Sequence, residues 1–227
     1  MDKQTLVISV GGSLIVPDAI DTNFLKALKV FVLSHIEKGA SFIIITGGGK
    51  TARRYQDAAN EVTPLTRDDL DWLGIHATRL NAHLLRSIFF EQAHPIINTD
   101  PTEAVPTTHK IVIAAGWKPG WSTDYDAVLL AKNVGAKKVI NLSNIDYAYT
   151  ADPKKDPTAT AIEKITWPEF RKLLPEKWDP GLSSPFDPIA AKEAEALGLE
   201  VAIINGSKLD EVTNYLEGKS FVGTKIE

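Results

Sequence analysis

The sequence predicts a three-layer α/β/α fold built around a mainly parallel sheet. Short apolar runs alternate along the chain with longer segments of helical periodicity. The runs at Thr5 to Val10 and Ser41 to Ile45 contain few polar residues, which is typical of strands covered on both faces. Between two further predicted strands, Ile111 to Ala115 and Lys138 to Leu142, a helix opens at Ser122. This is the βαβ pattern of parallel strands, whose ligands bind beyond the carboxyl ends.

The predicted helices carry apolar residues three or four positions apart. Besides the helix at Ser122, they cover Asn23 to Lys38, Asp69 to Gln92, Trp167 to Leu174, Ile189 to Leu197 and a last helix containing Leu209, Val212 and Leu216. Capping signals precede two of them, Thr166 with Glu169 and Ser207 with Asp210. The remaining predicted strands are Pro95 to Asn98, Glu200 to Ile204 and Phe221 to Ile226, and a long loop spans Pro175 to Pro188.

The composition excludes several classes of protein. A net charge of −4 argues against a protein that binds nucleic acid through bulk positive charge. The absence of cysteine excludes disulfides, thiolate metal sites and a thiol nucleophile. No apolar run approaches the roughly 18 residues that span a bilayer, and the N-terminus lacks a secretory pattern. We expect a soluble, cytoplasmic protein without a membrane partner.

Two glycine-rich loops follow the first two predicted strands. The first is Gly11-Gly12-Ser13, which is either a simple turn or a site where backbone N–H groups approach an anion. The second is Gly47-Gly48-Gly49, followed by Lys50, Arg53 and Arg54. It is not a Walker A loop, because that motif requires glycine where this chain has Ile44. We favour a phosphate site over a basic surface turn, since three successive glycines are conformationally costly unless they are used.

Polar residues in the long predicted helix allow two interpretations. Asp71 is either a first-turn acid stabilised by the helix dipole or part of a site. His76 and His83 lack the spacing of a paired metal site, so we predict no protein-held metal.

Taken together, these motifs resemble the amino-acid-kinase superfamily, and most closely the archaeal type of UMP kinase. The resemblance extends over nearly the whole chain and rests on motif order and spacing. The motifs are Gly11-Gly12-Ser13, Gly47-Gly48-Gly49-Lys50 with Arg53, Asp71 before Gly74-Ile75, Pro119-Gly120 with Thr123-Asp124, Tyr149-Thr150-Ala151-Asp152-Pro153, and Ser183-Ser184 with Asp187-Pro188.

The resemblance implies one amino-acid-kinase domain over residues 1–227, with the acceptor site in its N-terminal part and the ATP site in its C-terminal part. It implies a transferase of pyrimidine nucleotide synthesis that binds ATP and UMP, uses Mg²⁺ carried by ATP, and forms a homo-oligomer, hexameric by family likeness. The implied ATP-binding residues are Gly11, Gly12, Ser13, Gly49, Arg53, Ser143, Asn144, Tyr149 and Asp152. The implied UMP-binding residues are Gly48, Asp71, Trp117, Lys118, Pro119, Gly120, Trp121, Ser122 and Thr123.

The catalytic residues implied by the resemblance are Asp124, Arg53 and Lys50, with the Asp124 charge holding donors such as Lys50 or Arg53 in position. This chain departs from the family pattern at three places. Ser9 replaces a lysine that many members carry, Tyr147 replaces a glycine, and Trp117 and Trp121 replace smaller or more polar residues. We therefore predict ATP-dependent UMP phosphorylation. The alternatives are a kinase for another small phosphate or carboxylate acceptor, and a non-catalytic nucleotide- or oxyanion-binding protein.

Overall fold

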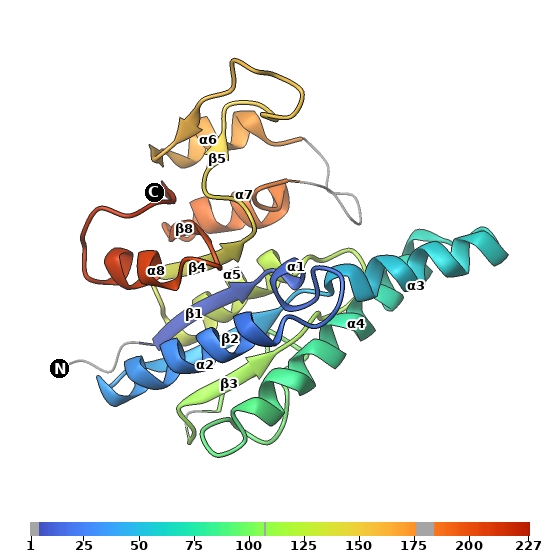
Figure 1. Ribbon diagram of the computed structural model, residues 1–227, viewed down its shortest axis with the longest axis horizontal. Coiled ribbons are helices and arrows are strands. Elements are labelled where there is room, and N and C mark those ends of the chain that lie inside the picture. The colour runs from blue at the N-terminus through green and yellow to red at the C-terminus, as the bar shows by residue number, and fades with distance from the viewer. Residues whose placement is uncertain (1–4, 107, 176–183) are drawn as a thin grey trace.

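The computed structural model describes residues 5–106, 108–175 and 184–227. Within them, seven strands form one sheet in the order β3-β2-β1-β4-β8-β9-β7, and β5 and β6 form a separate pair. The strands are β1 Thr5–Val10, β2 Ser41–Thr46, β3 Ile111–Ala114, β4 Lys138–Ser143, β5 Ala148–Tyr149, β6 Ala161–Ile162, β7 Lys164–Ile165, β8 Glu200–Asn205 and β9 Thr224–Ile226. The predicted α/β/α class with a mainly parallel sheet is confirmed (Figure 1).

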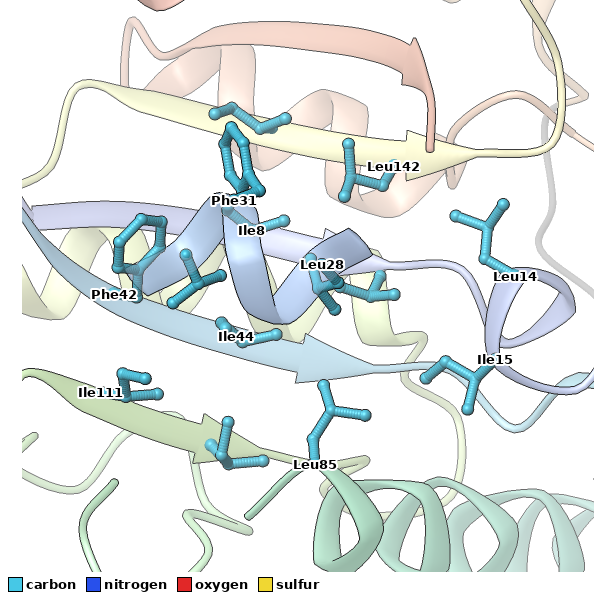
Figure 2. Close-up of a cluster of buried hydrophobic side chains, with 14 of the residues drawn as sticks. Ile8, Leu14, Ile15, Leu28, Phe31, Phe42, Ile44, Leu85, Ile111 and Leu142 are labelled. Atoms are coloured by element: carbon cyan, nitrogen blue, oxygen red, sulfur yellow. The ribbon is translucent and has the colours of Figure 1, made fainter. Parts of the chain in front are cut away.

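Helices cover both faces of the sheet. They are α1 Gly12–Ile15, α2 Thr22–Glu37, α3 Gly49–Val62, α4 Arg67–Ile88, α5 Thr123–Val134, α6 Trp167–Leu173, α7 Pro188–Ala196 and α8 Leu209–Leu216. Side chains of α1, α2, α4 and α8 pack in one core cluster, which Figure 2 shows around Ile8, Leu28 and Leu85. Side chains of α5, α6 and α7 pack in the second cluster on the opposite face.

The alternation of side chains along β1 connects both layers. Leu6, Ile8 and Val10 belong to the first core cluster, whereas Val7 belongs to the second. Because successive strand residues point to opposite faces, Ser9 shares the face of Val7 and lies toward α5. Burying each such aliphatic side chain stabilises the fold by about 1.5–3 kcal/mol. Serine at position 9 gives up that stabilisation.

Strand directions place several loops at one edge. β1 pairs in parallel with β2 and β4, β2 with β3, and β4 with β8. Their carboxyl ends therefore lie at the same edge of the sheet. From β1 the chain adds β2 and β3 on one side and β4 and β8 on the other, so the strand order reverses between β1 and β4. Open α/β sheets bind ligands at such a point.

Two local predictions were wrong. The strand expected at Pro95 to Asn98 is replaced by isolated bridges at Ala93 and Asn98. Pro95 cannot donate to a ladder, and the Ile96 N–H donates to His94 Nδ1 instead (3.2 Å). The expected cap at Ser207 is also absent, because its hydroxyl donates to Asn205 Oδ1 (2.8 Å) and Lys208 occupies the N-cap position of α8.

The other predicted elements are present with shifted ends. The last strand is β9, shorter than Phe221 to Ile226, and the long helix α4 ends at Ile88 rather than Gln92. The capping box of Thr166 and Glu169 at the start of α6 is confirmed. Part of the predicted loop Pro175 to Pro188, including Ser183, lies outside the described residues. None of the helices in the described ranges is long and apolar enough to cross a membrane.

Candidate active site

The two glycine loops interlock at the carboxyl edge of the sheet. The Gly11 N–H donates to Leu142 O (2.8 Å), which ties the first loop to β4, and the Gly47 N–H donates to Val10 O (2.9 Å). A Cβ atom at Gly12 would lie 2.0 Å from the Gly49 nitrogen and 2.6 Å from the Gly47 carbonyl carbon. The backbones of the two loops thus lie against each other, and only glycine fits at position 12.

Basic side chains follow the second loop on α3. The amino group of Lys50 and the guanidinium of Arg54 both pair with Asp18, at 3.2 and 2.7 Å. Their hydrogen bonds and charges, that of Lys50 first, hold the pKa of Asp18 below its usual value. Cations at a helix start oppose the helix dipole, and Asp18 relieves part of that conflict. Arg53 lies between them in sequence and is exposed.

Asp124 lies in the first turn of α5, beside the end of β1. Its Oδ1 accepts from the Ser9 hydroxyl (3.3 Å), and its Oδ2 accepts from the Asp187 N–H (3.2 Å). Burial, and then the Asp187 charge, raise the pKa of Asp124 to about 7. Within the described part of the chain, Asp124 makes no hydrogen bond or ion pair with Lys50, whose amino group pairs with Asp18 instead. Ser9 is uncharged, so no cation is supplied at this position of β1.

The loop at residues 116–121, hereafter the acceptor loop, connects β3 to α5 and is tied to α4. The Gly116 N–H donates to Thr78 Oγ1 (2.8 Å), and the Trp117 carbonyl accepts from Arg79 Nη2 (3.1 Å). The Gly120 N–H donates to Asp71 Oδ2 (2.7 Å). Burial raises the pKa of Asp71, although the bond from Gly120 opposes that shift. The α4 helix therefore holds the loop along its length.

Sequence reasoning missed several of these residues. Thr78 and Arg79 bind the acceptor loop, and the Asn81 amide donates to Gly47 O (2.8 Å), which joins α4 to the glycine loop as well. A signal was available: Asp71, Thr78 and Asn81 follow one another at helical spacing, so they share one face of α4. Asp187 was predicted only as part of a motif. Its N–H contact with Asp124 joins residues 63 positions apart and has no local signal in the sequence.

Aromatic rings stiffen the acceptor loop and the start of α5. Trp121 stacks with both Trp117 and Tyr125, with ring centroids 6.2 and 4.3 Å away. The Lys118 ammonium lies 3.7 Å from the Trp117 ring centroid. Protein side chains thus stack with Trp121, which supports a packing role for this ring.

Comparison with known proteins identifies the family. The model of the amino acid kinase family matches residues 4–205. The chain belongs to this family. It is 34% identical to the uridylate kinase of Thermococcus kodakarensis, with 98% of this chain and 99% of the relative covered. It is 36% identical to the uridylate kinase of Methanospirillum hungatei, with 98% and 94% covered. The crystal structure of the uridylate kinase from Archaeoglobus fulgidus superposes with a TM-score of 0.80 at 29% identity, covering 99% of this chain and 100% of that one.

In this amino acid kinase, the predicted ATP residues fall into two groups. Gly11, Gly12, Gly49 and Ser143 lie together at the strand ends, and Ser143 O accepts from the Gly206 N–H (2.8 Å). Tyr149 lies in the small β5–β6 pair. Asp152 is exposed, and its carboxylate accepts from the Lys154 N–H (3.0 Å) within its own turn. The second group is thus held by the hairpin, not by the glycine loops.

Two further features of the kinase bear on its ligands. Among the described residues, no cluster of three or more His, Asp or Glu side chains could hold a metal ion. A cavity of about 570 Å³ lies at the opposite edge of the sheet, lined by residues such as Thr5, Ser41 and Lys110. It lies at the amino ends of the strands and is separate from the glycine loops.

Proposed function

We propose that this amino acid kinase transfers the γ-phosphate of ATP to UMP, giving ADP and UDP. The observation that carries the proposal is the interlock of Gly12 with Gly47 and Gly49, which brings two glycine-rich backbone segments together at the carboxyl ends of the strands. Relatives named uridylate kinases, similar over the full length of the chain, support UMP as the acceptor.

The proposed reaction follows from this arrangement. A phosphate oxygen of UMP attacks the γ-phosphorus of ATP, a new P–O bond forms, and the bond to the β–γ bridging oxygen breaks as ADP leaves. The acceptor phosphate is ionised near pH 7, so no base is needed to remove a proton. The protein has to align two phosphates and stabilise developing negative charge. Backbone N–H groups and basic side chains are suited to that task, and each well-placed donor contributes about 3–4 kcal/mol.

The residues expected to bind each substrate remain part of the proposal. Gly11, Gly12, Ser13, Gly49 and Arg53 would hold the ATP phosphates, and Ser143, Asn144, Tyr149 and Asp152 would surround its nucleoside. Gly48, Asp71 and the segment 117–123 would hold UMP. The hydrogen bond from the Gly120 N–H to Asp71 supports the UMP assignment, since Asp71 and the acceptor loop lie side by side.

Asp124, Arg53 and Lys50 are the proposed catalytic residues. Asp124 would orient groups at the junction of the loops through its Ser9 and Asp187 contacts. Lys50 and Arg53 would form ion pairs with the phosphates. Lys50 would first have to break its ion pair with Asp18.

Mg²⁺ is the proposed metal, and the donor groups present fit an ion that ATP carries. Magnesium prefers oxygen ligands and retains several waters. The site offers backbone N–H groups and dispersed carboxylates and, among the described residues, no three-ligand cluster, so phosphate oxygens and water would supply most of the coordination. The bound ion would neutralise charge on the ATP phosphates.

We further propose one domain over residues 1–227, with acceptor contacts in its N-terminal part and ATP contacts in its C-terminal part, that assembles as a homo-oligomer. Trp72 and Leu80 on α4, and Phe90 just beyond its end, are 42, 62 and 63% exposed. Large apolar side chains that are exposed favour association. The α3 helix, which extends away from the sheet in Figure 1, has no buried residue. The hexamer implied by the resemblance is the oligomer to test by light scattering.

One observation favours a second candidate, a nucleotide- or oxyanion-binding protein without turnover. Among the described residues, no lysine or arginine side chain binds Asp124. Its carboxylate accepts from the Ser9 hydroxyl and the Asp187 N–H. A non-catalytic protein could keep both glycine loops without the missing cation.

A coupled ADP-release assay separates these functions. It should be run with Mg-ATP and UMP, CMP, a panel of small phosphates and carboxylates, and no acceptor, with ³¹P NMR to identify the product. UMP-dependent ADP release with UDP formation supports the proposal. Release with another acceptor alone supports the related kinase. Nucleotide binding by calorimetry without any release supports the non-catalytic candidate, and Gly12→Val should abolish activity in either kinase.

A further inference from the structure

Asp126 is a buried carboxyl that the site described above does not use. It lies in the first turn of α5 and is 0% exposed. Its Oδ2 accepts a hydrogen bond from the Trp117 N–H (3.1 Å). Within the part of the chain that the structure describes, its Oδ1 is buried and has no hydrogen-bond partner.

The backbone carbonyl of Trp117 is bound by a residue of a different helix. Its carbonyl accepts from Arg79 Nη2 (3.1 Å), and Arg79 lies on α4. The backbone of this residue is therefore bound through its N–H by α5 and through its carbonyl by α4. Its ring contacts Lys118 and Trp121. Trp117 is the point at which the acceptor loop is fixed between the two helices.

A role in helix stability does not explain Asp126. Burial raises the pKa of Asp126 to about 8, and the charges of Asp100, Asp124 and Asp187 add to the shift. The carboxyl is therefore mainly protonated at neutral pH and gains little from the helix dipole, which favours charge. Its neighbours Ala127 and Val128 belong to the apolar core. An apolar side chain would satisfy the packing without an unpaired polar atom.

We propose that Asp126 is a positioning residue for the acceptor, which fixes the acceptor loop by holding the Trp117 N–H. The α4 helix carries Asp71 at one end of this loop and Arg79 at the other, and Asp126 adds the opposing anchor from α5. The proposal deepens the UMP kinase function, because a loop fixed before binding presents one shape to the acceptor nucleotide. Asp126 acts through Trp117 and does not touch the reacting atoms.

The positioning itself can be tested without turnover. Asp126→Val removes the acceptor oxygen at similar size, and Asp126→Asn retains one. Asp210→Val is the matched control, because Asp210 is an exposed first-turn acid of α8. Amide hydrogen exchange of Trp117, followed by NMR, should become about tenfold faster in Asp126→Val. It should remain near the parent rate in Asp126→Asn and Asp210→Val. Unchanged exchange in Asp126→Val overturns the proposal.

Kinetics then test the consequence for the acceptor. Asp126→Val should raise the KM for UMP about tenfold and change the KM for ATP less than twofold, with Asp126→Asn restoring the parent value. Equal increases in both KM values, or a fall in Tm that Asp126→Asn does not rescue, would assign Asp126 to the fold and overturn the proposal. If Asp126→Val does not fold, Arg79→Met tests the opposite anchor by the same exchange and KM measurements, and parent values for that variant overturn it. If the parent does not phosphorylate UMP, the proposed function fails, while the exchange result still decides the positioning role.

Discussion

The Asp71 carboxylate and the Gly120 N–H meet at 2.7 Å, although 49 positions separate them in the sequence. One hydrogen bond thus joins the first turns of a long helix to the C-terminal end of the acceptor loop. The same carboxylate retains oxygen lone pairs for a ligand hydroxyl, because an ionised acid accepts several hydrogen bonds.

Replacing Asp71 by asparagine should weaken UMP binding more than ATP binding. The amide oxygen can still accept from Gly120, so the loop stays tied, but the charge that strengthens a bond to a ribose hydroxyl is lost. A loss of about 1.5–3 kcal/mol in UMP affinity is expected. Calorimetry with each nucleotide measures it, and Asp68→Asn, an exposed acid in the same helix turn, is the control. Equal losses for both nucleotides, or none for UMP, would return Asp71 to a helix-start role.

Arg53→Ala should lower kcat/KM at least tenfold, or about 1.4 kcal/mol, with the fold intact. Arg53 is exposed beside the glycine loop, so its removal leaves no cavity, and its expected role is to meet phosphate charge. Arg54→Ala is the matched control, because Asp18 already binds that guanidinium. Steady-state kinetics should separate the two arginines, and near-parent values for Arg53→Ala would contradict the assignment.

Asp124→Asn should reduce kcat about 100-fold or more, change both substrate affinities only modestly and not lower Tm. The asparagine can keep one oxygen for Ser9 or Asp187, so the local geometry survives and only the charge is removed. Stopped-flow single-turnover measurements would locate the loss in the chemical step. A variant with the parent kcat would reduce Asp124 to a first-turn acid and favour the non-catalytic candidate.

The raised pKa values of Asp124 and Asp126, about 7 and about 8, predict how stability depends on pH. Each acid binds its proton more tightly in the folded state than in the unfolded chain, where the pKa is about 3.9. Between pH 5 and 8 the folded state therefore holds more protons, and the free energy of unfolding falls as pH rises, by up to about 1.4 kcal/mol per pH unit for each group.

Denaturant unfolding from pH 5 to 8 measures this dependence. Asp126→Asn should make the profile less steep between pH 5 and 7, where Asp124 still contributes, and nearly flat above pH 7, because the amide does not titrate. Asp210→Asn should leave the profile unchanged. A parent protein whose stability rises with pH across this range would contradict the buried, protonated state of Asp126.

Local features of the site could be predicted from sequence, and long-range ones could not. The glycine loops and the start of α5 are encoded within a few consecutive residues, because a strand end, glycines and a cap lie together in the chain. The contact of Arg79 with Trp117 depends on how α4 lies against the acceptor loop, 38 positions away. Asp126 was also missed, since a helix packed between the sheet and α7 is apolar on more than one side and gives no clear inward face.

The pairing of Lys50 with Asp18 could not be predicted for a related reason. The sequence shows a basic helix start but not which acid folds back over it, and Asp18 lies in the connection between α1 and α2. The missing strand at Pro95 to Asn98 has a local cause instead. Its apolar residues fit a strand, but proline and the His94 side chain redirect the backbone hydrogen bonds.

The contact of Gly12 with Gly47 and Gly49 limits where the molecule can open. Two backbones that leave no room for a single methyl group have little freedom to shift against each other. We therefore expect product release to begin elsewhere around the nucleotides. We expect the acceptor loop to move after turnover, because separate hydrogen bonds join it to Thr78, Arg79, Asp71 and Asp126 and these can break one at a time.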